Sequence, residues 1–186
     1  MDALLAAFVT ALLAEWGDKT QLVAIMLAAS TRRPAAIVAG LFLAAIASSI
    51  FAGIAGVYVA GLVTIRAMSL MVALALLFGG LAGLVRRRTP APATARLPIA
   101  TAFILFLAAE LGDRTQFLTF AIAGRFDSAP LAAAGATAGI MAAGIPAILL
   151  GDRLKSTMPV KAIRYGVAGL FLLAGFIVAV NALRLT

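Results

Sequence analysis

The chain has 186 residues, of which 64% are hydrophobic and only 12% are charged, and a water-soluble core of this size does not need so much apolar surface. It contains no cysteine and no histidine, which excludes disulfide bonds and zinc or copper sites built on thiolate or imidazole ligands. Any metal handled by this chain must therefore be held by oxygen.

Six apolar stretches follow one another along the chain, each long enough to cross a membrane, for which about 20 helical residues suffice. They lie at roughly 4–29, 36–61, 67–85, 98–123, 131–150 and 162–183. The connections between them leave no room for a soluble domain. Asp2, and the absence of a basic side chain before Lys19, favour a retained first span over a cleaved signal peptide. We therefore expect residues 1–186 to form a single all-α integral membrane domain of six transmembrane helices.

The net charge of +8 is distributed as expected for membrane topology, and it does not predict binding to nucleic acid. If the N-terminus lies outside the cytoplasm, ten basic residues fall in inner loops and three in outer loops or the C-terminus. The inner set is Arg32, Arg33, Arg86, Arg87, Arg88, Arg96, Arg153, Lys155, Lys161 and Arg164, the outer set is Arg66, Arg125 and Arg184, and Lys19 and Arg114 lie within spans. The positive-inside rule thus predicts both termini outside the cytoplasm.

The longest connection is rich in proline, small residues and arginine, which is typical of a linker, at about 87–97. It separates repeat 1, about 1–86, from repeat 2, about 98–186. At an offset of 95 residues, the segment 14–21 (AEWGDKTQ) lies over 109–116 (AELGDRTQ), with six of eight positions identical. Because each half has three spans, the second half enters the membrane from the opposite side. The pattern predicts a 3+3 inverted-topology repeat, an arrangement found in secondary transporters.

Both repeated segments carry acids near the middle of a span. Glu15 and Glu110 lie about 17 Å along their helices, close to the centre of a hydrocarbon core of about 30 Å. On a continuous helix Glu15 and Asp18 share one face, as do Glu110 and Asp113. Charged groups at this depth cost at least ~2.5–3.5 kcal/mol each, so they are expected to face the protein interior and to mark a functional pathway.

A purely structural reading pairs Glu15 with Lys19 and Glu110 with Arg114 at the i, i+4 spacing. This reading does not account for Asp18 and Asp113, which add one surplus negative charge in each half. The two surplus charges together balance one divalent cation.

The oxygen-bearing side chains of the two segments suit a hard cation such as Mn²⁺, Ca²⁺ or Mg²⁺. The predicted ligands are the four acids with Thr20, Gln21, Thr115 and Gln116. Buried carboxylates also bind protons more readily when no metal is present, so metal and protons would compete for the same oxygens. The four acids are therefore also the predicted proton-coupling groups, with Lys19 and Arg114 as charge-balancing or gating residues.

Gly17 and Gly112 stand between the acids of each segment. Glycine at this place serves close helix packing or weakens the helix, so that freed carbonyl groups line the site. We include both as predicted helix-breaking residues at the site.

The segments Glu15-Trp-Gly-Asp18-Lys19-Thr20 and Glu110-Leu-Gly-Asp113-Arg114-Thr115 resemble the duplicated Glu-x-Gly-Asp-(Lys/Arg)-(Ser/Thr) signature of the Golgi-type manganese/calcium–proton antiporters, a family that includes bacterial manganese exporters. The resemblance covers the whole chain. It implies exchange of Mn²⁺, or else Ca²⁺, for protons, with both as substrates and no bound cofactor. It also implies export of Mn²⁺ across a bacterial inner (cytoplasmic) membrane, with the lipid bilayer, the cation and protons as the partners; oligomeric state is left open.

Three other functions fit parts of the pattern. A small six-helix exporter of an amino acid or another cationic or zwitterionic solute could use Lys19 and Arg114 to meet a substrate carboxylate. An intramembrane aspartyl protease could use Asp18 and Asp113 as a dyad, although such enzymes have glycine where Glu15 and Glu110 stand. A passive cation channel would need no proton coupling. The doubled surplus of acid argues against the amino-acid exporter, and the mirrored repeat with its charged centre favours alternating access over a channel.

Overall fold

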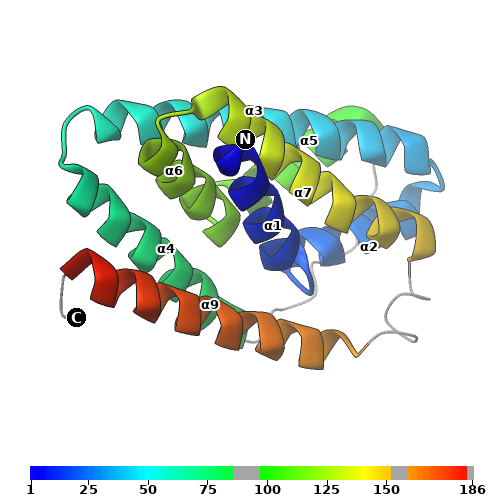
Figure 1. Ribbon diagram of the computed structural model, residues 1–186. Helices are drawn as coiled ribbons and strands as arrows, with labels where there is room; N and C mark the ends of the chain where they lie inside the picture. Colours follow the sequence, from blue (N-terminus) through cyan, green and yellow to red (C-terminus); the bar gives the residue numbers. More distant parts are fainter. Residues whose placement is uncertain (86–96, 152–158, 184–186) are drawn as a thin grey trace.

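The computed structural model describes residues 1–85, 97–151 and 159–183, and within these residues the regular structure is entirely helical (Figure 1). The helices are α1 (Asp2–Glu15), α2 (Lys19–Thr31), α3 (Pro34–Ala60), α4 (Ile65–Leu84), α5 (Pro98–Glu110), α6 (Arg114–Phe126), α7 (Ala129–Leu150) and α9 (Val160–Leu183). Four of them are long and apolar enough to cross a membrane: α3, α4, α7 and the stretch Lys161–Leu183 of α9. The chain is thus an all-α multi-pass membrane protein.

The first and fourth predicted spans are not continuous helices, and in this respect the prediction was wrong. The stretch 4–29 is divided into α1 and α2, and the stretch 98–123 is divided into α5 and α6. Each interruption falls inside an acidic segment, between Glu15 and Lys19 and between Glu110 and Arg114. Hydropathy does not detect these breaks because the residues on both sides of them remain apolar enough to read as one span.

The helices of the second half repeat those of the first at a nearly constant spacing, with α5 beginning 96 residues after α1. The helices α6, α7 and α9 begin 95 residues after α2, α3 and α4, respectively. This is the offset that aligns the two acidic segments. The correspondence therefore extends along the whole of both halves, well beyond the short stretch in which the residues are identical.

The short helices of each half pack against a long helix of the other half. The helix α1 lies along α7, and α5 lies along α3 (Figure 1). Glycines on the long helices permit the close approach. A Cβ atom at Gly139 would lie 2.6 Å from the carbonyl oxygen of Phe8 in α1, and one at Gly40 would lie 2.9 Å from that of Ile99 in α5. Gly135 and Gly139 thus serve contacts within the protein, as small residues do at membrane helix interfaces.

Much of the predicted topology lies outside the described residues. This holds for positions 87–96 of the linker and for the basic residues Arg86, Arg87, Arg88, Arg96, Arg153, Lys155 and Arg184. Lys161 and Arg164, assigned to a loop from the sequence, lie instead in the first turns of α9.

Candidate functional site

The two acidic segments form turns of nearly the same backbone shape. Trp16 has φ −66° and ψ 120° and Leu111 has φ −61° and ψ 120°, and each is followed by a glycine with φ +72°. The amide of Asp18 donates to the carbonyl oxygen of Glu15 at 3.2 Å, and that of Asp113 donates to Glu110 at 3.0 Å. These are the features of a type II turn, which requires a residue with positive φ at its third position. The glycine of each motif is therefore needed for its backbone conformation.

A glutamine one turn into the following helix supports each turn. The side-chain oxygen of Gln21 accepts a hydrogen bond from the Gly17 amide at 2.9 Å, and that of Gln116 accepts one from the Gly112 amide at 2.7 Å. The sequence predicted these oxygens as cation ligands. In the structure they are hydrogen-bonded to the turns, so the glutamines hold the acids in position.

Each turn places an acid at the end of one helix and an acid at the start of the next. Glu15 ends α1 and Glu110 ends α5, while Asp18 and Asp113 are the N-cap residues of α2 and α6. The unpaired amide groups at a helix N-terminus carry partial positive charge, which stabilises nearby carboxylates. All four acids are buried, with exposed fractions of 6% or less.

The glutamates of one half accept hydrogen bonds from threonines of the other half. Thr115 Oγ1 donates to Glu15 Oε1 at 2.5 Å, and Thr20 Oγ1 donates to Glu110 Oε1 at 3.1 Å. The other oxygen of each glutamate, Oε2, is buried without a hydrogen-bond partner among the described residues. Each glutamate therefore presents one oxygen that a cation or a proton can take.

The basic residues also pair across the halves, in contrast to the i, i+4 pairing of the purely structural reading. Lys19 Nζ lies 2.9 Å from Asp113 Oδ1, and Arg114 Nη2 lies 3.7 Å from Asp18 Oδ1. The purely structural alternative, with Glu15–Lys19 and Glu110–Arg114 pairs, assumed a continuous helix, and the helix is interrupted between each glutamate and the basic residue that follows it. Four acids and two bases still leave two negative charges when all are ionised.

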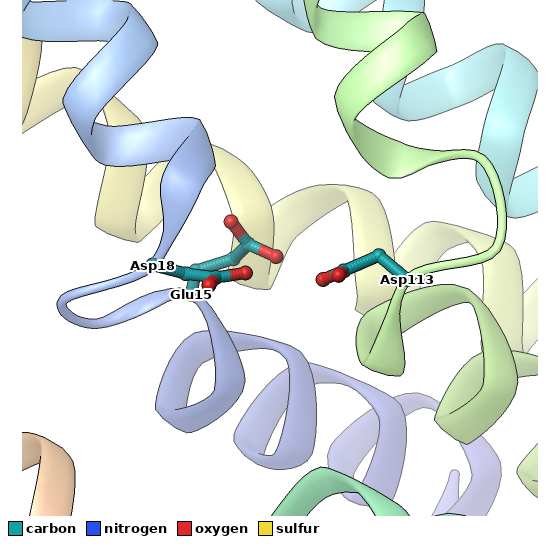
Figure 2. A group of neighbouring side chains, drawn as sticks. All are labelled: Glu15, Asp18 and Asp113. Atoms are coloured by element: carbon teal, nitrogen blue, oxygen red, sulfur yellow. The ribbon is translucent and has the colours of Figure 1, made fainter. Parts of the chain in front are cut away.

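Three of the acids come close enough together to hold a metal ion. Glu15, Asp18 and Asp113 each offer an oxygen, and these oxygens lie within 4.8 Å of one another. Figure 2 shows Asp113 pointing from its turn toward Glu15 and Asp18 on the opposite turn. Two oxygens on opposite sides of a Ca²⁺ ion are about 4.6–5.2 Å apart, so this spacing is compatible with direct coordination. Glu110 lies outside this group of three and is connected to the first half through Thr20.

The two basic residues differ in their surroundings. The side chain of Arg114 is 2% exposed, whereas that of Lys19 is 31% exposed. Arg114 also donates a hydrogen bond to the carbonyl oxygen of Ala14, and it lies beside Gly83 of α4, where a Cβ atom would be 3.2 Å from Nη1. Sequence reasoning missed both Ala14 and Gly83, since a backbone carbonyl and a packing glycine on a distant helix leave no motif.

Comparison with known proteins places the chain among membrane transporters. The family model described as "Divalent cation/proton antiporter GDT1" matches residues 3–91 and 98–185. A protein of Vibrio cholerae named "Putative manganese exporter" is 35% identical over 176 residues, which cover 93% of this chain and 88% of that protein. No solved structure matches the chain.

Proposed function

Because the chain belongs to the GDT1 family of divalent cation/proton antiporters, and is thus a cation transporter and not an enzyme, we propose that it exchanges Mn²⁺ for protons and exports Mn²⁺ from the cytoplasm. Ca²⁺ is the second candidate substrate. The observation that carries the proposal is the cluster of Glu15, Asp18 and Asp113, whose oxygens lie within 4.8 Å of one another.

The cluster combines the properties that exchange requires. Together with Glu110, it gives four acids against the two bases Lys19 and Arg114, a surplus of two that matches the charge of one divalent cation, and its acids come from both halves of the chain. Glu15 Oε2 and Glu110 Oε2 have no protein donor among the described residues. With the cation bound these oxygens are ligands or second neighbours of the metal, and with the cation gone protons neutralise them. Binding of the cation therefore displaces protons, and binding of protons displaces the cation.

The arrangement of the halves suits alternating access to a single site. We propose that residues 1–86 and 98–186 are inverted repeats, with both termini outside the cytoplasm and the site near the membrane midplane. The two segments matched by the family model, 3–91 and 98–185, and the spacing of 95 residues between the starts of three helix pairs support this organisation. Half-helices whose ends meet at the site are a recurrent device of transporters built in this way. The bacterial relative supports a place in the bacterial inner membrane.

Lys19 and Arg114 then have a role at the interface between the halves. Each of these basic side chains forms a salt bridge with an aspartate of the other half, so the two salt bridges connect the halves across the site. We propose that these salt bridges hold the aspartates in position when no metal is bound. They loosen when a divalent cation binds the aspartates in place of the basic side chains.

The test is transport by the purified protein in liposomes. Mn²⁺ is supplied outside, a Mn²⁺-sensitive dye is trapped inside, and the lumen is made acidic. Entry of Mn²⁺ that depends on the acidic lumen, and that Ca²⁺ or Mg²⁺ reduces while alanine and lysine do not, is the expected result. Glu15→Gln and Asp113→Asn should each abolish it. Asp127→Asn is the matched control, because Asp127 is an exposed acid at the C-cap of α6, away from the cluster.

Two results would contradict the proposal. Mn²⁺ entry that ignores the pH gradient and follows only the Mn²⁺ gradient would indicate a channel. Entry that persists unchanged in Glu15→Gln and Asp113→Asn would mean that the acidic cluster is not the exchange site.

A further inference from the structure

The helices α4 and α9 form a symmetric pair. A Cβ atom at Gly80 of α4 would lie 2.9 Å from the carbonyl oxygen of Ala168, and one at Gly175 of α9 would lie 3.0 Å from that of Ala73. Gly80 and Gly175 are 95 residues apart, as are Ala73 and Ala168, so the same contact is made twice, once from each half. At the far end of the pair, Arg66 donates hydrogen bonds of 2.6 and 2.7 Å to the last carbonyl groups of α9. These contacts make the pair a unit.

The packing of this unit on the remaining helices is one-sided. The helix α4 packs against α6, where the rings of Phe78 and Phe117 have centroids 5.6 Å apart. The corresponding contact of the other half would bring α9 against α2. The helix α9, however, packs mainly against α4, and its buried residues Val167 and Phe171 lie in one cluster with Leu118 and Ala121 of α6, while no comparable packing joins α9 to α2 among the described helices. Leu173, which corresponds to Phe78, is 59% exposed and Phe78 is 45% exposed, so the two positions differ in the ring contact with α6 and not in burial. Figure 1 shows α6 and α2 toward opposite ends of the long helix α3.

The glutamines that support the two turns show the same asymmetry. Gln21 Nε2 donates to the carbonyl oxygen of Ala143 in α7 at 3.1 Å. Gln116 Nε2 is buried and has no hydrogen-bond partner among the described residues. Ala143 corresponds to Ser48 of α3 in the first half. The carbonyl oxygen of Ser48 is therefore the equivalent acceptor for Gln116, and it lies on the long helix against which α6 packs. Gln21 thus joins the turn at Gly17 to a long helix by a hydrogen bond, and among the described residues Gln116 makes no such bond for the turn at Gly112.

We propose that the two halves exchange these conformations during transport, and the inference rests on the proposed function. The α4–α9 unit rocks from α6 to α2, so that Leu173 packs on Leu22 in place of the Phe78–Phe117 contact. Gln116 then donates to the carbonyl oxygen of Ser48, and Gln21 releases that of Ala143. Phe78–Phe117 and Leu22–Leu173 are therefore two alternative contacts of the α4–α9 unit, one with each helix that follows an acidic turn.

The absence of cysteine from the chain makes the proposal directly testable by cross-linking. One variant carries Phe78→Cys with Phe117→Cys, and a second carries Leu22→Cys with Leu173→Cys. Both are oxidised in liposomes to form a disulfide, and Mn²⁺/proton exchange is measured before oxidation, after it, and after reduction. The register control is Leu22→Cys with Phe176→Cys, since Phe176 is also exposed on α9 but has no counterpart in the Phe78–Phe117 contact.

Both main pairs should cross-link, the second pair several-fold more than the register control. Each cross-link should stop exchange, and reduction should restore it, because either disulfide traps one of the two states. If reduced Leu22→Cys/Leu173→Cys protein is inactive, Val23→Cys with Ala174→Cys replaces it, as the counterpart of the Gly79–Leu118 contact between α4 and α6.

Failure of this proposal and failure of the proposed function give different results. If α9 never cross-links to α2 above the register control while the reduced variants exchange Mn²⁺ for protons, the rocking motion is wrong and the antiporter stands. If the second pair cross-links but neither it nor the unmodified chain exchanges Mn²⁺ for protons, the motion stands and the proposed function is wrong.

Discussion

The hydroxyl group of Thr115 donates a hydrogen bond of 2.5 Å to Glu15, a residue 100 positions earlier in the chain and in the other half of the protein. The corresponding bond joins Thr20 to Glu110 at 3.1 Å. Each acidic segment is thus completed by its counterpart, and neither half by itself contains a finished site.

Thr115→Val should lower the apparent affinity for Mn²⁺ about tenfold or more. The substitution keeps the shape of the side chain but removes a hydrogen bond to a buried carboxylate, and bonds to charged groups contribute about 1.5–3 kcal/mol. The measurement is the Mn²⁺ concentration that gives half-maximal exchange in liposomes. Thr115→Ser retains the hydroxyl group and should behave like the unmodified protein; equal behaviour of the valine and serine variants would show that the bond is not used.

Lys19 and Asp113 should be coupled energetically across the two halves. A double-mutant cycle with Lys19→Gln and Asp113→Asn, measured by thermal unfolding in detergent, should give a coupling free energy of about 0.5–3 kcal/mol, in the lower part of that range because Lys19 is partly exposed. The comparison cycle replaces Asp113→Asn with Glu15→Gln, which tests the pair expected on a continuous helix. A larger coupling between Lys19 and Glu15 would contradict the geometry of the broken helix.

Gly17→Ala and Gly112→Ala should each destabilise the protein by about 1–2 kcal/mol, because both glycines have φ +72° and an L-residue with a Cβ atom is strained there. The added Cβ at Gly112 would meet nothing within 4 Å, so any loss reports backbone strain and not a clash. The midpoint of thermal unfolding is the readout. Gly169→Ala is the control: it also has open space, and it lies within α9, where alanine favours the helix. A Gly112→Ala variant as stable as the unmodified protein would argue against the turn.

Binding of Mn²⁺ should weaken as the pH falls. The cation requires ionised carboxylates, so each proton that it displaces lowers its apparent affinity about tenfold per pH unit where the acids titrate. Displacement of two protons would give about a hundredfold per unit and would make the exchange electroneutral. Titration calorimetry at several pH values gives the slope. A slope of zero across the range in which the protein stays folded would remove the basis for proton coupling.

The amino-acid sequence alone determined the membrane class, the acids and their duplication. Long apolar stretches can be counted without a structure because a membrane span requires little else, and the repeated acidic segment is visible because charged residues are rare at that depth. The offset of 95 residues found in those eight positions also separates the starts of α2, α3 and α4 from those of α6, α7 and α9.

Tertiary structure decided the pairing and the shape of the site. On an unbroken helix, where residues four apart are neighbours, Glu15 could pair with Lys19 and Glu110 with Arg114. The type II turns break the helices at those residues, and Lys19 and Arg114 pair with Asp113 and Asp18 of the opposite half instead. Local sequence cannot specify such contacts, because which side chain lies opposite a buried charge depends on how two distant segments pack. For the same reason, only the fold shows that Arg114 lies beside Gly83 and that the α4–α9 pair packs on α6 and not comparably on α2 among the described helices.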